Sequence, residues 1–173
     1  MRKGLYSRNT IVDYKTQYER AIFEKFASVC PHKINRNTIK SLIPPNPDIC
    51  VEMQDTQKLY FELTECVCES IAQQAGESSK ALRANESSAK EHDAIAFKED
   101  SLFNKSMEKF GKSYKADASI ELLSYFNQQA EPLGDVLSRY IYFVEEHIGK
   151  SPFRRVWVYD VFRNKILYDF PKV

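Results

Sequence analysis

The chain has few of the residues that form linkers and disulfide frameworks. Its 173 residues include 5 Gly, 7 Pro and 4 Cys. So little Gly and Pro disfavours a linker-built or low-complexity chain, and four cysteines are too few for a disulfide scaffold. The C-x-C pair of Cys66 and Cys68, with three scattered histidines, matches no zinc-binding spacing. We therefore expect free thiols, as in a cytoplasmic protein.

An excess of charge of one sign is also absent, because 25 Lys and Arg face 24 Asp and Glu. This balance argues against a strongly basic coat or histone-like protein and against an acidic disordered tail. It leaves room for a local basic groove that binds nucleic acid. No run approaches the roughly 18 apolar residues of a membrane-spanning helix. The charged first residues lead into no apolar segment, so we expect no secretory signal and a cytoplasmic location.

Helical and strand patterns alternate along the chain, which is long enough for one domain with a hydrophobic core. The expected elements are a helix over 10–29, a weak strand over 37–43, a hairpin of strands over 49–53 and 59–64, a helix over 101–112, a strand over 120–126, a helix over 132–148 between Pro132 and Gly149, and strands over 155–161 and 165–170. Residues 69–97 form a polar excursion, either helix or loop. The alternation predicts a single α/β (α+β) domain with a central mixed β-sheet flanked by helices.

The first helix carries a glutamate on its apolar face. Tyr18, Ile22, Phe23 and Phe26 form the buried stripe at helical spacing, and Glu19 falls inside it. A carboxylate in such a stripe needs a cation, a hydrogen bond or a metal. Alternatively, it lies at the edge of the stripe and reaches water.

The expected hairpin carries two further carboxylates, those of Asp48 and Glu62. If Met53 lies opposite Gln57, Asp48 lies opposite Glu62, and the two side chains share one face of the sheet. A slip of one residue would send them to opposite faces, so a three-residue turn or a bulge is required. One or two carboxylates, waters and a substrate phosphate usually hold Mg²⁺. In the alternative interpretation, Asp48 caps a strand after a proline-rich turn and Glu62 faces solvent on an edge strand.

Pro47-Asp48, followed after a short strand by Glu62-Leu63-Thr64, resembles the PD-(D/E)XK nuclease superfamily, which has the restriction-endonuclease-like fold. The order of elements supports the resemblance, which runs from the helix with Glu19 to the strand over 120–126. The resemblance implies that Asp48 and Glu62 bind Mg²⁺, with Mn²⁺ as the alternative ion. It also implies that Glu19 completes the metal site.

The chain departs from the superfamily pattern at two places. Thr64 stands where the motif lysine is expected, and a hydroxyl cannot supply a cation. Some members carry that lysine on the neighbouring helix, where this chain offers Lys105, Lys109 and Lys112 at helical spacing. We expect Lys109 or Lys112 to act beside Thr64, although the three lysines could equally form a solvated helix face. The second departure is the weak pattern of the first strand.

The implied chemistry is metal-assisted hydrolysis of phosphodiester bonds, with DNA favoured over RNA. Such an endonuclease also needs a basic surface for the backbone. The sequence offers Lys105, and it offers Arg154, Arg155 and Arg163 near its C-terminal strands. Many nucleases of this fold act as dimers, so a homodimer is a second partner to consider.

Three hypotheses follow. The chain is a magnesium-dependent nuclease, or a catalytically inactive member of the same fold that binds nucleic acid or protein. The third is an unrelated small α/β interaction protein of the immunity or antitoxin kind. The sequence leaves open whether the chain is an enzyme. No dinucleotide-binding, P-loop or HExxH motif favours another catalytic class.

Overall fold

The computed structural model describes residues 8–66, 100–127 and 134–171. Within these ranges, one mixed β-sheet of six strands has three flanking α-helices. The strands follow one another across the sheet in chain order: β1 (Ile34–Ser41), β2 (Ile49–Met53), β3 (Lys58–Glu65), β4 (Ile120–Phe126), β5 (Phe153–Asp160) and β6 (Lys165–Pro171). The β3–β4 and β4–β5 pairs are parallel and the others antiparallel. The α/β class with a mixed sheet is thus confirmed.

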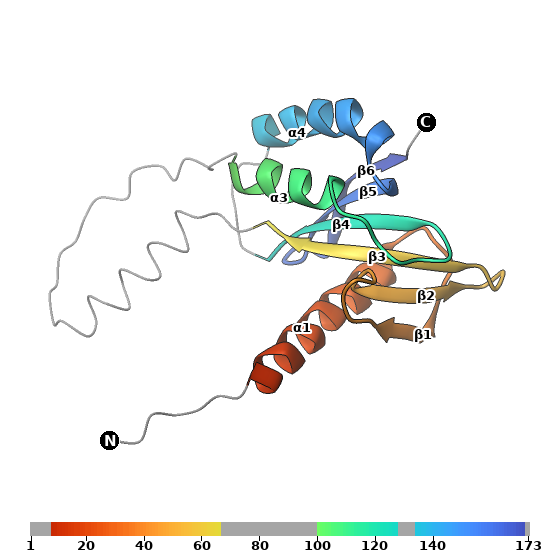
Figure 1. Cartoon of the computed structure of the whole chain (residues 1–173). Helices are drawn as coiled ribbons and strands as arrows, with labels where there is room; N and C mark the ends of the chain where they lie inside the picture. The colour runs from red at the N-terminus through yellow and green to blue at the C-terminus, as the bar shows by residue number, and fades with distance from the viewer. Residues whose placement is uncertain (1–7, 67–99, 128–133, 172–173) are drawn as a thin grey trace, which may run out of the picture.

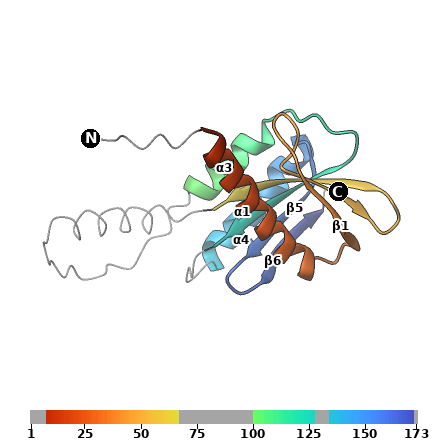
Figure 2. The same ribbon diagram turned by 90° about the horizontal axis from the view of Figure 1, so that it is seen from below.

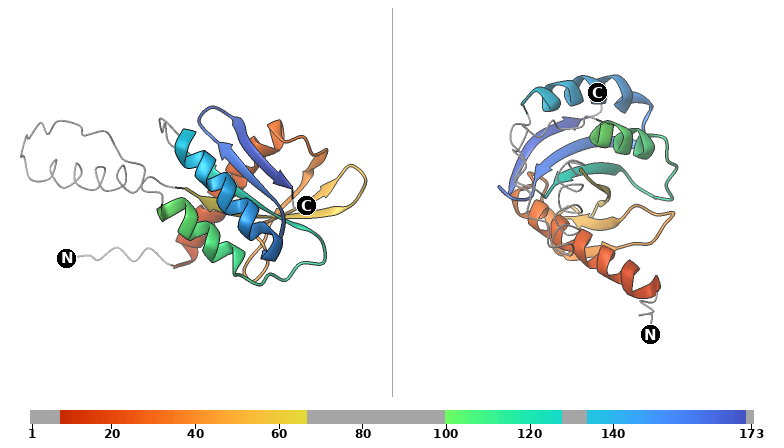
Figure 3. Two further views of the ribbon diagram at one scale, coloured as in Figure 1. Left: turned by 90° about the horizontal axis from the view of Figure 1, so that it is seen from above. Right: turned by 90° about the vertical axis from the view of Figure 1, so that its left-hand side faces the viewer.

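The helices cover both faces of the sheet (Figures 1 and 3). α1 (Arg8–Val29) lies across one face, as Figure 2 shows from below. α3 (Asp100–Phe110) and α4 (Gly134–His147), followed by a 3₁₀ turn (Ile148–Lys150), lie on the other. α3 precedes β4 and α4 precedes β5, as expected of connections between parallel strands.

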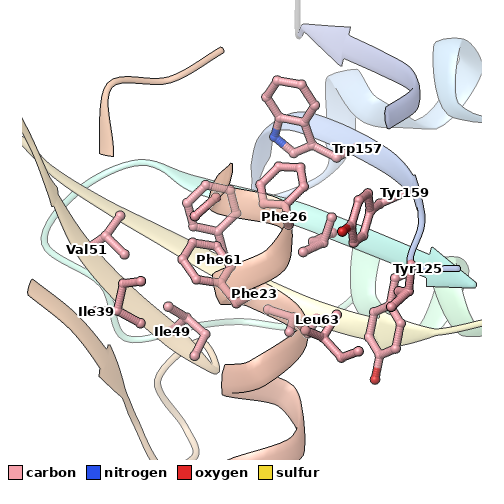
Figure 4. Packing of buried hydrophobic residues seen from close by; sticks show 14 of the residues in the cluster. Phe23, Phe26, Ile39, Ile49, Val51, Phe61, Leu63, Tyr125, Trp157 and Tyr159 are labelled. Atoms are coloured by element: carbon pink, nitrogen blue, oxygen red, sulfur yellow. The ribbon is translucent and has the colours of Figure 1, made fainter. Parts of the chain in front are cut away.

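Each face of the sheet has its own hydrophobic core. Under α1, the Phe26 ring packs edge-on against Trp157 and Tyr159, with ring centroids 5.5 and 5.6 Å apart (Figure 4). The other core is formed with residues of α3 and α4 and includes Phe110 and Tyr140. Every residue of β4 is buried, because this central strand is covered on both faces. The apolar run over 120–126 correctly predicted this strand.

The β2–β3 hairpin has the register on which the carboxylate hypothesis depends. Ile49 pairs with Phe61 and Val51 with Leu59, and the Met53 N–H donates to the Gln57 carbonyl at 2.8 Å. The turn therefore has three residues. Its last residue, Thr56, has φ 68°, the left-handed conformation that three-residue hairpin loops use at this position.

Several expected boundaries were wrong, for local reasons. β1 starts at Ile34, three residues before the expected strand over 37–43, because its pairing is irregular between Asn35 and Lys40 and this obscures the alternation. The Thr38 hydroxyl donates to the Asn35 carbonyl (2.7 Å) and accepts the Glu52 N–H (2.8 Å) within this irregularity.

The helix ends also differ from expectation. α1 begins at Arg8 and not at Thr10. α3 ends at Phe110, before Gly111, a residue that disfavours helix, so Lys112 lies beyond the helix. Gly149 lies within the 3₁₀ turn and not after it. Pro132 and the excursion over 69–97 lie outside the described residues. No α-helix in the described ranges is both long and apolar enough to cross a membrane.

Candidate functional site

The register of the hairpin brings Asp48 and Glu62 to one face of the sheet. The antiparallel ladder ends at Ile49 and Phe61, and one further step places Asp48 opposite Glu62. The Asp48 Oδ2 atom accepts the Leu63 N–H at 2.8 Å, so its carboxylate lies against β3 beside Glu62. The hairpin therefore has the register that places Asp48 and Glu62 on the same face of the sheet.

Beyond Phe61, the edge of β3 is open, because β2 begins only at Ile49. At this edge α1 and α3 enclose a cavity of about 350 Å³, whose lining includes Lys15, Glu19, Thr64, Lys105, Lys109 and Lys112. The cavity lies towards the C-terminal end of β3. The structure thus brings residues of α1, β3 and α3, together with Lys112 just beyond α3, around one hollow.

Glu62 is buried, with 4% of its surface exposed, so the interpretation of a solvent-facing edge residue was wrong. Its Oε1 atom accepts a short hydrogen bond from Lys109 Nζ. Burial and then the charge of Asp48 raise the pKa of Glu62, and Lys109 opposes them only in part. The Lys109 side chain is itself only 16% exposed, so it does not belong to a solvated helix face.

Glu19 approaches the same carboxylates from α1. Its side chain is 13% exposed, and it pairs with Lys15 at 3.4 Å. Burial, followed by the charge of Asp48, raises the pKa of Glu19. Among the described residues, however, no three Asp, Glu, His or Cys side chains lie close enough to hold one metal ion. Asp48 and Glu62 share one face of the sheet, and the Glu19 carboxylate lies near enough to Asp48 to feel its charge.

The remaining residues predicted on β3 and α3 also border the cavity. Lys112 pairs with Glu108 at 3.0 Å, and this hydrogen bond is the main cause of its raised pKa, to which Glu62 and Asp48 also contribute. Lys105 Nζ donates to the Glu65 carbonyl at 2.5 Å. Thr64 is buried on β3 and pairs with Ser124 of β4. Of the three lysines, Lys109 is the one that contacts Glu62.

The predicted arginines lie at both ends of the sheet. Arg154 and Arg155 are at the start of β5, where they pair with Glu121 (2.8 Å from Arg154 Nε) and with Asp169, respectively. Arg163 follows β5 and pairs with Asp160 at 3.0 Å. Because β3, β4 and β5 are parallel, Arg163 lies at the same end of the sheet as the cavity and the other two lie at the opposite end.

Two features of the structure, Tyr114 and the surroundings of Glu121, were not predicted from the sequence. The first is Tyr114, in the loop between α3 and β4, whose ring packs against Phe153 with centroids 5.7 Å apart. Its hydroxyl is buried without a hydrogen-bond partner. Burial and the nearby charge of Glu62 raise the pKa of Tyr114. No motif or spacing distinguishes a loop tyrosine of this kind.

The second group surrounds Glu121, which is fully buried on β4. Its carboxylate accepts hydrogen bonds from Trp157 Nε1 (2.6 Å), Arg154 Nε (2.8 Å) and His32 Nε2 (3.0 Å). The donors come from β5 and from the loop between α1 and β1, and together they occupy both carboxylate oxygens. This cluster lies under the α1 side of the sheet, away from Asp48 and Glu62.

Comparison of the chain with models of known protein families finds no match, and comparisons with curated proteins and with solved structures find none either. The function must therefore be inferred from the residues themselves.

The chemistry of the site follows from its donor set. Asp48 and Glu62 offer hard oxygen atoms, which suit Mg²⁺ or Mn²⁺ and not softer metals. Two carboxylates are enough for Mg²⁺ when waters and a substrate phosphate complete its coordination. Lys109 adds a positive charge at the same position, and the cavity beside them can admit a phosphate group. The residues fit a divalent cation and an anionic substrate together.

Proposed function

We propose that the chain is a magnesium-dependent nuclease that hydrolyses phosphodiester bonds, in DNA before RNA, with a core of the PD-(D/E)XK type. One observation carries the proposal. The hairpin register puts Asp48 and Glu62 on one face, and α3 supplies Lys109 to Glu62. Because Thr64 replaces the motif lysine, a nuclease of this type needs a lysine from another element. Lys109 contacts Glu62 from α3, the helix on which the sequence predicts such a lysine.

Asp48 and Glu62 would hold the ion, with Glu19 as an outer ligand through water. A bound Mg²⁺ would polarise the phosphoryl oxygen and lower the pKa of water. Lys109 would hold the attacking water in place and offset negative charge on the phosphate. Thr64, whose hydroxyl can donate or accept, would hydrogen-bond to the same water or phosphate.

The lysines around the cavity would bind the nucleic-acid backbone. Lys105 and Lys112 border the cavity on the α3 side and Lys15 on the α1 side. Arg163 lies at the same end of the sheet and can extend this surface. Arg154 and Arg155 would contact only a substrate long enough to reach the other end. The proposal includes a cytoplasmic location, with which the free thiols of Cys30, Cys50 and Cys66 agree, and it allows a homodimer.

The test compares the wild type with Glu62→Ala and Lys109→Met on plasmid, single-stranded DNA and RNA, in Mg²⁺ or Mn²⁺. We expect the wild type to cleave at least one substrate and both variants to lose at least about 100-fold in rate. Glu24→Gln is the matched control, because Glu24 is exposed on α1 and pairs with the exposed Arg20. Equal cleavage by the wild type and Glu62→Ala would assign the activity to a contaminant and contradict the proposal.

A second candidate is a protein of the same fold that binds nucleic acid without cleaving it. Lys109 already neutralises the carboxylate that would hold the ion, and no third metal ligand joins Asp48 and Glu62 among the described residues. Retention of DNA by the wild type in Mg²⁺ without cleavage, equally strong in Glu62→Ala, would favour this candidate.

A further inference from the structure

The Tyr114 hydroxyl is one of two buried side-chain polar atoms in the described ranges that have no hydrogen-bond partner, the other being Ser41 Oγ. A buried hydroxyl without a partner costs free energy, and such groups are rare in folded proteins. This one has a specific neighbourhood, because the phenol lies near Glu62, Asp48 and Glu108.

The tyrosine is held in place from two sides. Its ring packs against Phe153 at the edge of the α3–α4 core. Its loop is tied to the segment that leads to Asp48, because the Lys115 N–H donates to the Pro45 carbonyl at 3.2 Å. The hydroxyl is therefore fixed beside the carboxylates and is not free to turn to solvent.

Glu62 has a different partner in the structure. Its Oε1 atom accepts from Lys109 Nζ. The Tyr114 hydroxyl has no hydrogen bond of full geometry, although the charge of Glu62 and a weak hydroxyl–carboxylate interaction with it both raise the pKa of Tyr114. A divalent cation at Glu62 would compete with the Lys109 ammonium for the same oxygen, because like charges repel. A neutral donor beside a cation meets no such repulsion.

We propose that Tyr114 is a positioning residue of the site, whose hydroxyl donates a hydrogen bond to the Glu62 carboxylate when that carboxylate binds a divalent cation in place of Lys109. This inference rests on the proposed function. A phenol with the ordinary tyrosine pKa of about 10 is protonated at neutral pH, as a donor must be. The hydrogen bond would fix the orientation of Glu62 once its ion pair with Lys109 is broken.

The test measures Mn²⁺ binding by calorimetry at pH 7 and unfolding by urea for the wild type, Tyr114→Phe and Tyr140→Phe. We expect Tyr114→Phe to bind Mn²⁺ about tenfold more weakly, equivalent to about 1.4 kcal/mol. Its stability should equal or exceed that of the wild type, because the ring remains and only an unpaired hydroxyl is lost.

Tyr140→Phe is the matched control. The Tyr140 hydroxyl is buried but bonded to Ser106 (2.6 Å) and Ser124 (3.3 Å), so its removal should lower stability and leave Mn²⁺ affinity unchanged. A spectroscopic signature completes the test. Mn²⁺ should shift the near-ultraviolet tyrosine absorption to the red in the wild type but not in Tyr114→Phe, because only the wild type has a phenol whose hydrogen bond to the carboxylate strengthens.

The outcomes separate the two claims. If the wild type does not bind Mn²⁺, the proposed function fails and the role of Tyr114 fails with it. If the wild type binds and Tyr114→Phe has the same affinity, only the role of Tyr114 is overturned. Weaker binding accompanied by a comparable loss of stability would also overturn it, because the tyrosine would then be merely structural.

Discussion

Glu121 and Glu62 are buried on adjacent parallel strands, and replacing each with glutamine should change stability in opposite directions. The strands pair Phe61 with Glu121 and Glu62 with Leu122, so the two carboxylates point to opposite faces of the sheet. In both cases the substitution removes the charge and nearly preserves the shape.

Both carboxylate oxygens of Glu121 accept hydrogen bonds from buried or half-buried side chains. Burial alone would raise the pKa of its carboxyl, but hydrogen bonds from His32 and Trp157 and the charges of His32 and Arg154 outweigh it, so the pKa is lowered. Glutamine can accept from some of these donors but leaves the others without an acceptor. Removal of one partner from a buried charged network costs about 3–5 kcal/mol. We expect the lower value, about 3 kcal/mol, because one amide oxygen remains.

Glu62 is in the opposite situation. Burial and the charge of Asp48 outweigh its contact with Lys109, so the pKa is raised and the ionised form is less favourable in the folded chain than in the unfolded one. Glu62→Gln removes this cost and keeps an oxygen that can accept from Lys109. The free energy of unfolding at pH 7 should stay the same or rise by up to about 1 kcal/mol.

The two substitutions should also differ in their dependence on pH. The unfolded pKa of glutamate is about 4.3. Because the folded pKa of Glu121 is below this value, its stabilisation is complete above pH 4.3 and is lost as the pH falls through the folded pKa. Because the folded pKa of Glu62 is above it, the cost is complete above the folded pKa and disappears as the pH falls towards 4.3.

Urea unfolding of the wild type and both variants, at pH 7 and at intervals down to pH 4, tests this reasoning. With a urea dependence of about 2 kcal/mol per molar, Glu121→Gln should lower the midpoint by about 1.5 M. Asp169→Asn, which removes a half-exposed partner of Arg155, is the control and should cost less than about 1 kcal/mol. A loss below 1 kcal/mol for Glu121→Gln, or a loss above 2 kcal/mol for Glu62→Gln, would refute the reasoning.

Two further predictions concern the same hairpin and its lysine. Lys109→Met should destabilise the chain by about 1–3 kcal/mol at pH 7, because it leaves Glu62 buried without a cation. The Lys109→Met, Glu62→Gln double variant should recover most of this loss in urea unfolding. Purely additive effects of the two substitutions would contradict the pairing of Lys109 with Glu62. Thr56→Gly should stabilise the chain by about 1 kcal/mol, because Thr56 adopts φ 68°, which disfavours a β-branched residue; a lower thermal midpoint in Thr56→Gly would be the contrary result.

The hairpin and its carboxylates could be predicted because they depend on local patterns. Alternation indicated which residues of β3 share a face. The sequence left the register conditional on a three-residue turn or a bulge, and the structure has the three-residue turn between Met53 and Gln57. The helical spacing of Lys105 and Lys109 likewise placed both on α3. The bounds of β1 were harder to predict, since the irregularity after Asn35 disrupts the alternation that identifies a strand.

The partners of buried polar groups could not be predicted in this way. His32 and Glu121 are 89 positions apart in the sequence, and their contact exists only because the end of α1 packs over the sheet. The position of Tyr114 beside Glu62 depends on the path of a loop, which has no periodicity to interpret. Such contacts arise from tertiary packing, whereas the carboxylate pair arises from one turn.

The open edge of β3 also affects how the chain behaves towards other copies of itself. An unpaired strand edge can recruit a strand from another molecule and start aggregation. Here the Leu63 N–H is taken by the Asp48 carboxylate and the Glu65 carbonyl by Lys105. The Asp48 and Lys105 side chains thus occupy backbone groups that an incoming strand would use. They protect this strand edge against pairing with another copy of the chain.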